Sequence, residues 1–246
     1  MDARLTATEP ASGGWNMGFD EAMLAWAEGT GGMWLRFYQW APATLSLGYF
    51  QSLGSRAEHA ESRELPLVRR ASGGGAIVHH HELTYSFVIP LRGHRAGVLR
   101  GLTRQFHAAL VRALSAWEMR ASLCQEAEAA PRQQQPFLCF RRRAQDDVLL
   151  AGHKIAGSAQ RRSKGAVLQH GSVLLGRSPF APELPGIWEL SGRAISVEEL
   201  GIAWARELEP SLGCRLIGGA ATREDLERAE WWRRARYEAP GWTARR

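Results

Sequence analysis

A cysteine and a lysine fifteen residues apart are the first candidates for chemistry in this chain. Cys139 is followed closely by three arginines at positions 141–143, and neighbouring cations favour the thiolate, the nucleophilic form of cysteine. Lys154 is one of only two lysines among 31 basic residues. Because Arg supplies almost all other positive charge, we expect Lys154 to do what Arg cannot, as a compact ammonium on a flexible stem. The alternatives are an inert thiol and an ordinary surface lysine.

A glycine-rich loop is the second candidate. Three consecutive glycines, Gly73, Gly74 and Gly75, follow a predicted strand at 67–70. Glycines let the backbone approach a ligand closely and leave N–H groups for carbonyl or phosphate oxygens. The loop is not a Walker motif, because no Gly-Lys-Ser/Thr follows, and its glycine spacing is not that of a dinucleotide fold. A flexible turn is the alternative.

A run of three histidines follows the loop. In a strand, side chains alternate between faces, so His79 and His81 are expected to share one. Two histidines can begin a metal site, but the sequence offers no third ligand at a suitable spacing. We therefore predict no metal, and a hydrogen-bonded His79 that shapes the glycine loop.

The overall composition is that of an ordinary globular protein. The chain has 246 residues, 45% hydrophobic and 23% charged, which suits one large domain. Three cysteines without CxxC spacing argue against a disulfide framework or a zinc site and favour a reducing cytoplasm. The start of the chain lacks a signal-peptide pattern, and no apolar run approaches the ~20 residues that span a membrane. We expect a cytoplasmic monomer that makes no membrane contact.

The positive charge is concentrated in one segment. Residues 131–170 hold eight Lys or Arg and two Asp, which accounts for the whole net charge of +6. A basic segment of this kind indicates an acidic partner, either an acidic carrier protein or nucleic acid. Aromatic residues are not interleaved with these arginines, which weighs against nucleic acid. A solvated surface loop is the remaining alternative.

Hydrophobic periodicity predicts the elements. Residues 1–14 are expected to form a flexible arm, 125–136 a loop, and 15–246 a single catalytic domain that includes C-terminal helices at about 196–246. Predicted helices cover 16–28, 55–63, 97–118, 196–209 and 222–237. Predicted strands cover 34–40 and 44–50, as a hairpin-like pair, then 67–70, 84–89, 148–151, 154–159 and 167–175. This order predicts an α+β fold, a mixed sheet flanked by helices.

Several motifs occur together in the order of a known family. They are 16–22 (NMGFDEA), 35–40 (LRFYQW), 46–51 (SLGYFQ), 69–76 (RRASGGGA), 154–160 (KIAGSAQ) and 168–172 (LQHGS). Over roughly residues 15–176 the chain resembles the lipoate-protein ligase and octanoyltransferase family, whose fold it is expected to share with biotin ligases. Cys139-Phe140, fifteen residues before the motif lysine, looks like the corresponding pair in octanoyltransferases that form an acyl-enzyme. The residues at 72–75, Ser-Gly-Gly-Gly, are more similar to those of the ligases.

The resemblance implies a mechanism without a cofactor. Cys139 would take an octanoyl group from an acyl carrier protein and pass it to a lysine of a lipoyl domain, either the glycine-cleavage carrier or the acyltransferase (E2) subunit of a dehydrogenase. Lys154 would stabilise the thiolate and the oxyanion. The acyl chain would contact Arg70, Ser72, Gly73, Gly74, Gly75, Ala76, His79, Gly157, Ser158 and Ala159. The basic segment around 141–143 and 161–162 would steer acidic carriers. Two alternatives are an ATP-dependent lipoate ligase and a non-catalytic carrier-binding or nucleic-acid-binding protein.

Overall fold

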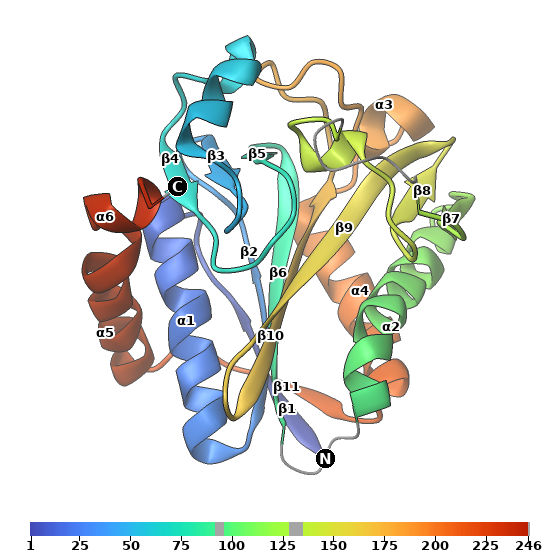
Figure 1. The fold of residues 1–246 in the computed structure, drawn as a ribbon. Helices are drawn as coiled ribbons and strands as arrows, with labels where there is room; N and C mark the ends of the chain where they lie inside the picture. Colours follow the sequence, from blue (N-terminus) through green and yellow to red (C-terminus); the bar gives the residue numbers. More distant parts are fainter. Residues whose placement is uncertain (92–95, 128–134, 246) are drawn as a thin grey trace.

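The computed structural model describes residues 1–91, 96–127 and 135–245, which form an eight-stranded sheet and a three-stranded sheet (Figure 1). The large sheet has the order β11-β1-β2-β6-β10-β9-β8-β7. Its strands are β1 (Asp2–Ala7), β2 (Met33–Tyr38), β6 (Glu82–Pro90), β7 (Ala121–Leu123), β8 (Val148–Leu150), β9 (His153–Arg162), β10 (Ala166–Leu174) and β11 (Arg215–Gly218). The small sheet is β4 (Leu67–Arg69), β3 (Thr44–Leu47) and β5 (Ile77–His79). The predicted mixed sheet flanked by helices is confirmed.

Helices cover both faces of the large sheet (Figure 1). On one side lie α1 (Gly13–Thr30) and α5 (Arg223–Trp232), and on the other α2 (Ala96–Ser115) and α4 (Val197–Leu212). Shorter helical segments are α3 (Ile187–Ser191), α6 (Pro240–Thr243), the 3₁₀ turns η1 (Leu53–Glu58), η2 (Ala60–Ser62) and η4 (Cys139–Arg141), and the π-helical η5 (Arg233–Tyr237). Within the described part of the chain, no helix is long and apolar enough to cross a membrane.

Alternation along the strands builds two cores. In β2, Leu35 and Phe37 pack into the core shared with α2 and α4, while Trp34 faces the α1 side. In β6, Phe87 and Val88 divide in the same way. A strand buried on both faces needs apolar residues at successive positions, as these strands have. The α1 face becomes polar toward one end of the sheet, and the site described below lies there.

The predicted flexible arm is wrong for residues 2–7. They form β1, which pairs in parallel with both β2 and β11. The missed signal is a short alternation: Ala3 and Leu5 pack on the α2/α4 core, and Arg4 on the other face lies 3.7 Å over the Trp34 ring and pairs with Asp225 at 2.7 Å. The sequence did not reveal this strand for two reasons. Its residues are mostly small or charged, and its partner strands come from distant segments of the chain.

The predicted hairpin of 34–40 with 44–50 is also wrong. β3 pairs with β4 and β5, not with β2. Leu45 and Leu47 bury in a separate cluster with Ala76, Val78 and neighbouring residues, so β3 belongs to the small sheet. By contrast, the helix predicted at 196–209 is present as α4, and a capping box at Ser196 opens it. The terminal helix predicted for 222–237 runs as α5 and then changes to η5, and the predicted loop at 125–136 falls largely outside the described residues.

Candidate active site

Two rows of cross-strand neighbours form the floor of a pocket on the polar end of the sheet. The first row joins Gly157, Ser172, Thr84 and Tyr38 across β9, β10, β6 and β2. The second row joins Ala159, His170, Ser86 and Arg36 in the same strands. Residues directly opposite one another share a face of the sheet. The small side chains at one end of each row leave space, and the polar ones at the other end interlock.

The pocket is a cavity of about 60 Å³. Its lining combines apolar and polar side chains, which is typical of small-molecule sites. The lining residues are Met17, Tyr38, Trp40, Arg70, Gly73, Gly74, Ile77, His79, Thr84, Cys139, Phe140, Lys154, Gly157, Ser158, Ala159, His170, Gly171 and Ser172. The structure thus brings Cys139, Lys154, Arg70, Gly73, Gly74, His79, Gly157, Ser158 and Ala159 to one cavity.

Cys139 reaches the pocket because its segment is held against the glycine loop. The Cys139 N–H donates to the Ala76 carbonyl at 2.7 Å, and the Ala76 N–H donates to the Phe137 carbonyl at 2.9 Å. Cys139 is half-buried, whereas the other two cysteines, Cys124 and Cys214, are buried. Burial raises the pKa of the Cys214 thiol. Cys139 is therefore the cysteine that the structure places at a cavity.

The buried cation on the loop side of Cys139 is Arg70. A side chain at Gly74 would place its Cβ 3.4 Å from an Arg70 nitrogen and 3.8 Å from the Cys139 sulfur, and Gly74 has a positive φ of 97° that favours glycine. Burial lowers the pKa of Arg70 to about 10, and the Coulombic interactions with Cys139 and Glu82 oppose this effect. The guanidinium remains charged at neutral pH.

The arginine run beside Cys139 is placed differently from our prediction. Arg142 donates to the Pro136 carbonyl at 2.7 Å and to Gln135 at 2.7 Å, and Arg143 donates to the Gly152 carbonyl at 2.6 Å. Gly75 leaves room for the Arg142 guanidinium, since a Cβ there would lie 2.9 Å from it. Arg142 and Arg143 thus hold local loops, and the cationic side chains that line the pocket together with Cys139 are Arg70 and Lys154.

Lys154 lies on β9 with its ammonium held by a carboxylate. Lys154 Nζ is 2.7 Å from Asp147 Oδ2, and both side chains are buried. Asp147 also accepts the Ala144 N–H at 2.6 Å, which fixes its orientation. Gly157 makes space for the lysine, because a Cβ at that position would lie 2.7 Å from Lys154 Cε. The strand pattern that we predicted for this motif therefore positions a buried, paired ammonium at the pocket wall.

The other three residues that we predicted to contact the acyl chain, Ser72, Gly75 and Ala76, do not line the pocket. Ala76 is fully buried and uses its N–H and carbonyl to hold the segment of Cys139. Gly75 accommodates Arg142, and its carbonyl accepts from Arg70 at 2.8 Å. Ser72 is buried, with Oγ 2.5 Å from His170 Nε2. These three residues support the loop from behind.

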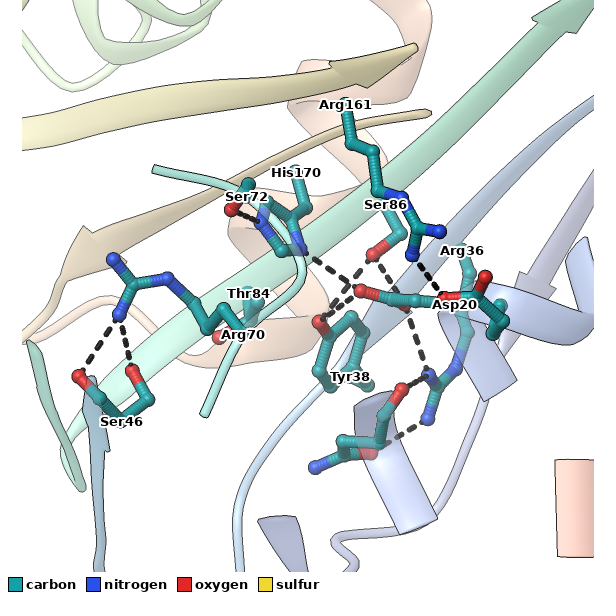
Figure 2. Close-up of polar contacts among 12 residues, drawn as sticks. Asp20, Arg36, Tyr38, Ser46, Arg70, Ser72, Thr84, Ser86, Arg161 and His170 are labelled. Atoms are coloured by element: carbon teal, nitrogen blue, oxygen red, sulfur yellow. Dashed lines mark hydrogen bonds and ion pairs between the residues drawn. The ribbon is translucent and has the colours of Figure 1, made fainter. Parts of the chain in front are cut away.

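His79 holds the glycine loop, as predicted, through an extended network. Its Nδ1 lies 2.5 Å from Glu82 Oε1 and its Nε2 2.7 Å from Ser46 Oγ. Arg70 donates to Ser46 Oγ at 2.6 Å (Figure 2). It also donates to the carbonyls of Gly73 and Gly75. β5 ends at His79, so the expectation that His79 and His81 share a strand face is wrong. Among the described residues no three His, Cys, Asp or Glu are grouped to hold a metal.

A second histidine, His170, lies on the floor of the pocket. Its Nδ1 is 2.9 Å from Asp20 Oδ2 and its Nε2 faces Ser72 (Figure 2). Our reading of the sequence assigned no role to His170 or Asp20. Both occur in the motifs that carry the family resemblance, at 168–172 and 16–22, so the motifs were the available signal. Only the fold joins residues 150 positions apart.

Ser158 belongs to another buried network. Its hydroxyl lies 2.6 Å from His107 Nε2 and 2.7 Å from the Tyr85 hydroxyl. Burial lowers the pKa of His107 and raises that of Tyr85. Because His107 Nδ1 faces the Asp146 carbonyl at 2.5 Å, which only accepts, its Nε2 accepts from Ser158. Ser158 is thus fixed at the pocket wall.

Comparison with known proteins identifies the family. Residues 12–179 match the model of the lipoyl protein ligase A/B catalytic domain, and the chain belongs to that family, as its motifs predict. Octanoyltransferase LipM of Kyrpidia tusciae is 33% identical over 99% of this chain and 98% of its own length. Octanoyltransferase LipM of Brevibacillus brevis is 32% identical over 99% of each chain.

Solved structures share the fold. The bi-partite lipoate protein ligase from Thermoplasma acidophilum, studied with its E2 lipoyl domain, superposes with a TM-score of 0.76 at 20% identity and covers 99% of this chain and 96% of its own. Lipoate-protein ligase A bound with ATP gives a TM-score of 0.75 at 21% identity, with 99% of each chain covered. At this identity the likeness supports the architecture alone.

Proposed function

We propose that the protein is an octanoyltransferase of lipoate biosynthesis. Cys139 attacks the thioester carbonyl of an octanoyl group on an acyl carrier protein, the carrier thiolate leaves, and an octanoyl-enzyme forms. A lysine of a lipoyl domain then attacks this thioester and forms an amide. The observation that carries the proposal is the position of the half-buried Cys139 at a cavity that also holds Arg70 and Lys154. The shared name of the full-length relatives supports octanoyl transfer.

Both pocket cations suit the first step. As the thiolate attacks, negative charge moves from sulfur to the carbonyl oxygen, and charges fixed where charge develops stabilise the transition state by a few kcal/mol. Apolar side chains at Met17, Trp40, Ile77 and Phe140 offer surface for an alkyl chain. Each methylene buried there contributes about 0.8 kcal/mol, so the pocket can select chain length.

The donor and acceptor are expected to be acidic, and exposed basic residues near the site suit them. Arg141, Arg143 and Arg162 are exposed in the segment that we identified from the sequence. Arg161 is committed differently, because it pairs with Glu21 inside the molecule. Steering by the exposed arginines would raise the association rate at low salt.

Intact mass spectrometry after mixing with octanoyl-carrier protein tests the proposal. Wild type should gain one octanoyl group, roughly 126 Da, as covalent catalysis requires. Cys139→Ser should gain none, and the matched control Cys124→Ser, which changes a buried cysteine, should be labelled normally. Unlabelled wild type would overturn the proposal. Pyrophosphate release with lipoate and ATP, undiminished in Cys139→Ala, would establish the ligase instead.

Lys154→Ala should slow labelling about 10²–10³-fold, the size of a lost oxyanion donor. Lys154→Arg should restore little of the labelling rate. Gly157 leaves space for the narrow lysine stem only, and Asp147 occupies the space beyond the ammonium, so the larger guanidinium does not fit there. The time course of octanoyl-enzyme formation measures both. Labelling of Lys154→Ala at the wild-type rate would remove Lys154 from the mechanism.

A further inference from the structure

Ser72, His170 and Asp20 form a continuous hydrogen-bonded row at the pocket (Figure 2). A carboxylate only accepts hydrogen bonds, so the His170 proton resides on Nδ1, which donates to Asp20 Oδ2 at 2.9 Å. His170 Nε2 is then the acceptor, and the Ser72 hydroxyl donates to it at 2.5 Å. The row therefore ends at the Ser72 hydroxyl, and the imidazole nitrogen that accepts from it carries no proton of its own.

The carboxylate behind the imidazole is buried and held in place. Asp20 is 2% exposed, and its Oδ1 accepts from Ser86 at 2.6 Å and lies 3.6 Å from Arg36. The Tyr38 hydroxyl is 3.4 Å from Oδ2. Asp20 thus fixes the tautomer of His170 and faces the charge that a proton on Nε2 would create. A base oriented in this way is a common element of acyl transfer.

The glycine loop connects Ser72 to Gly74, the residue beside the Cys139 sulfur. His170 lines the same pocket as Cys139. Ser72 is two residues before Gly74, whose Cβ position would be 3.8 Å from the Cys139 sulfur. An amine that attacks the thioester carbonyl on Cys139 therefore enters a cavity whose floor carries His170.

We propose that His170, oriented by Asp20 and linked to Ser72, accepts the proton that the attacking lysine amine must lose. As the C–N bond forms, the carbonyl electron pair moves to oxygen, and the nitrogen proton passes to Nε2 of His170, which gives up its hydrogen bond from the Ser72 hydroxyl. The tetrahedral adduct then collapses, the C–S bond breaks, and its electron pair returns to Cys139. The proton on His170 passes to that sulfur, so amine and thioester become amide and thiol.

This inference rests on the proposed octanoyl transfer and concerns its second step. The two half-reactions differ in what they require. A thiolate that attacks a thioester releases another thiolate, which leaves without help from an acid. An amine must lose a proton, which a positioned base typically accelerates about 10²–10⁴-fold. Loss of the base should therefore slow the second step and leave the first step nearly unchanged.

The test isolates octanoyl-enzyme and follows its single turnover with a lipoyl domain by intact mass. His170→Gln should form the octanoyl-enzyme at close to the wild-type rate and transfer it to the lysine about 10²–10⁴-fold more slowly. Asp20→Asn is nearly isosteric and serves as the second variant if His170→Gln does not fold. Its amide would offer an N–H to Nδ1 and shift the imidazole proton to Nε2, so transfer should also fall at least ~10-fold.

A matched control lies in the same molecule outside the pocket of Cys139. Ser62, His59 and Glu183 repeat the serine, histidine and carboxylate pattern, with His59 Nδ1 2.8 Å from Ser62 and Nε2 3.2 Å from Glu183. His59→Gln should leave both steps unchanged. Hydroxylamine provides a second control, because its adduct loses a proton to water easily. His170→Gln should therefore form octanoyl hydroxamate far faster, relative to wild type, than it transfers to lysine.

Lysine transfer at the wild-type rate in His170→Gln would overturn the inference. Equal losses in labelling, lysine transfer and hydroxylamine transfer would also overturn it, because they would indicate a structural role. Failure of wild type to become labelled is a different result, visible before any variant is made. That result would reject octanoyl transfer itself.

Discussion

Two serine–histidine–carboxylate groups meet at the pocket and differ in their surroundings. Ser46, His79 and Glu82 form one, and the row of His170 forms the other. In both, Nδ1 faces a buried carboxylate and Nε2 a serine hydroxyl. On pattern alone they are equivalent. Their neighbours give one the task of holding a loop and leave the other able to take a proton.

The two groups differ in where an arginine lies. Arg70 donates to the same Ser46 hydroxyl that faces His79, so a proton on His79 would be added next to a guanidinium. Trp40 also stacks on the His79 ring at 3.7 Å between centroids. Burial lowers the pKa of His79, with the Glu82 charge opposing the effect. His79 is therefore a neutral link between the small sheet and the glycine loop.

In the His170 group the guanidinium lies behind the carboxylate. Arg36 is 3.6 Å from Asp20 and is held by Asn16 and Thr8. It steadies Asp20 without bonding to the serine that faces Nε2. The comparison shows that the position of an arginine, on the serine or behind the carboxylate, distinguishes a structural histidine from a candidate base.

Removing Arg70 should have the largest effect on stability. Arg70→Met leaves the Ser46 hydroxyl and the carbonyls of Gly73 and Gly75 without their charged donor, and leaves Glu82 without a nearby buried cation. We expect a loss of about 3 kcal/mol in the free energy of unfolding, measured in urea. Labelling of Cys139 should slow as well.

Arg141→Met is the matched control, because Arg141 is exposed. Its unfolding free energy should stay within about 0.5 kcal/mol of wild type. If Arg70→Met were as stable as this control, the loop would not depend on the guanidinium. The contrast between the two histidine groups would then lose its physical basis.

Replacing each histidine by glutamine in turn should separate an effect on folding stability from an effect on acyl transfer. His79→Gln removes one of the donors to Glu82 and the stacking on Trp40, so we expect a loss of about 1–3 kcal/mol in unfolding free energy. Transfer from octanoyl-enzyme to lysine, measured on the folded fraction, should change little compared with His170→Gln. A transfer defect in His79→Gln as large as that in His170→Gln would show that the two groups act alike.

Much of the fold was accessible from the sequence, because long apolar periods mark buried elements. The helices at 16–28 and 97–118 and the strands at 84–89 and 167–175 appear close to their predicted bounds. The errors in the predicted fold occur where strand pairing determines the structure. β1 is short and half polar, and β3 follows β2 directly in the chain yet pairs elsewhere. Local pattern does not specify a distant partner.

The site divides in the same way. Cys139 and Lys154 stood out by composition and spacing, and both line the pocket. Asp147 and Asp20 were missed, because each acts by holding a group that is remote in sequence or oriented only by folding. Of the three arginines that follow Cys139, Arg142 and Arg143 donate to nearby backbone carbonyls, and neither lines the pocket. Proximity in sequence predicted reactivity, and contacts in the fold decide which cation faces the pocket.

The smallest expected effect concerns how stability depends on pH. Burial holds the pKa of His79 and of His107 below 6.5, so below pH 6.5 the unfolded chain binds protons that the folded protein refuses. Their contribution to stability is complete above pH 6.5 and is lost as the pH falls toward their folded pKa values, by up to about 1.4 kcal/mol per pH unit for each. His79→Gln should therefore flatten the decline of unfolding free energy between pH 6.5 and 5, measured in urea at a series of pH values, and His79→Gln/His107→Gln should flatten it further. An unchanged slope in His79→Gln would mean that His79 accepts protons freely when folded, and it would then compete with His170 for the role of base.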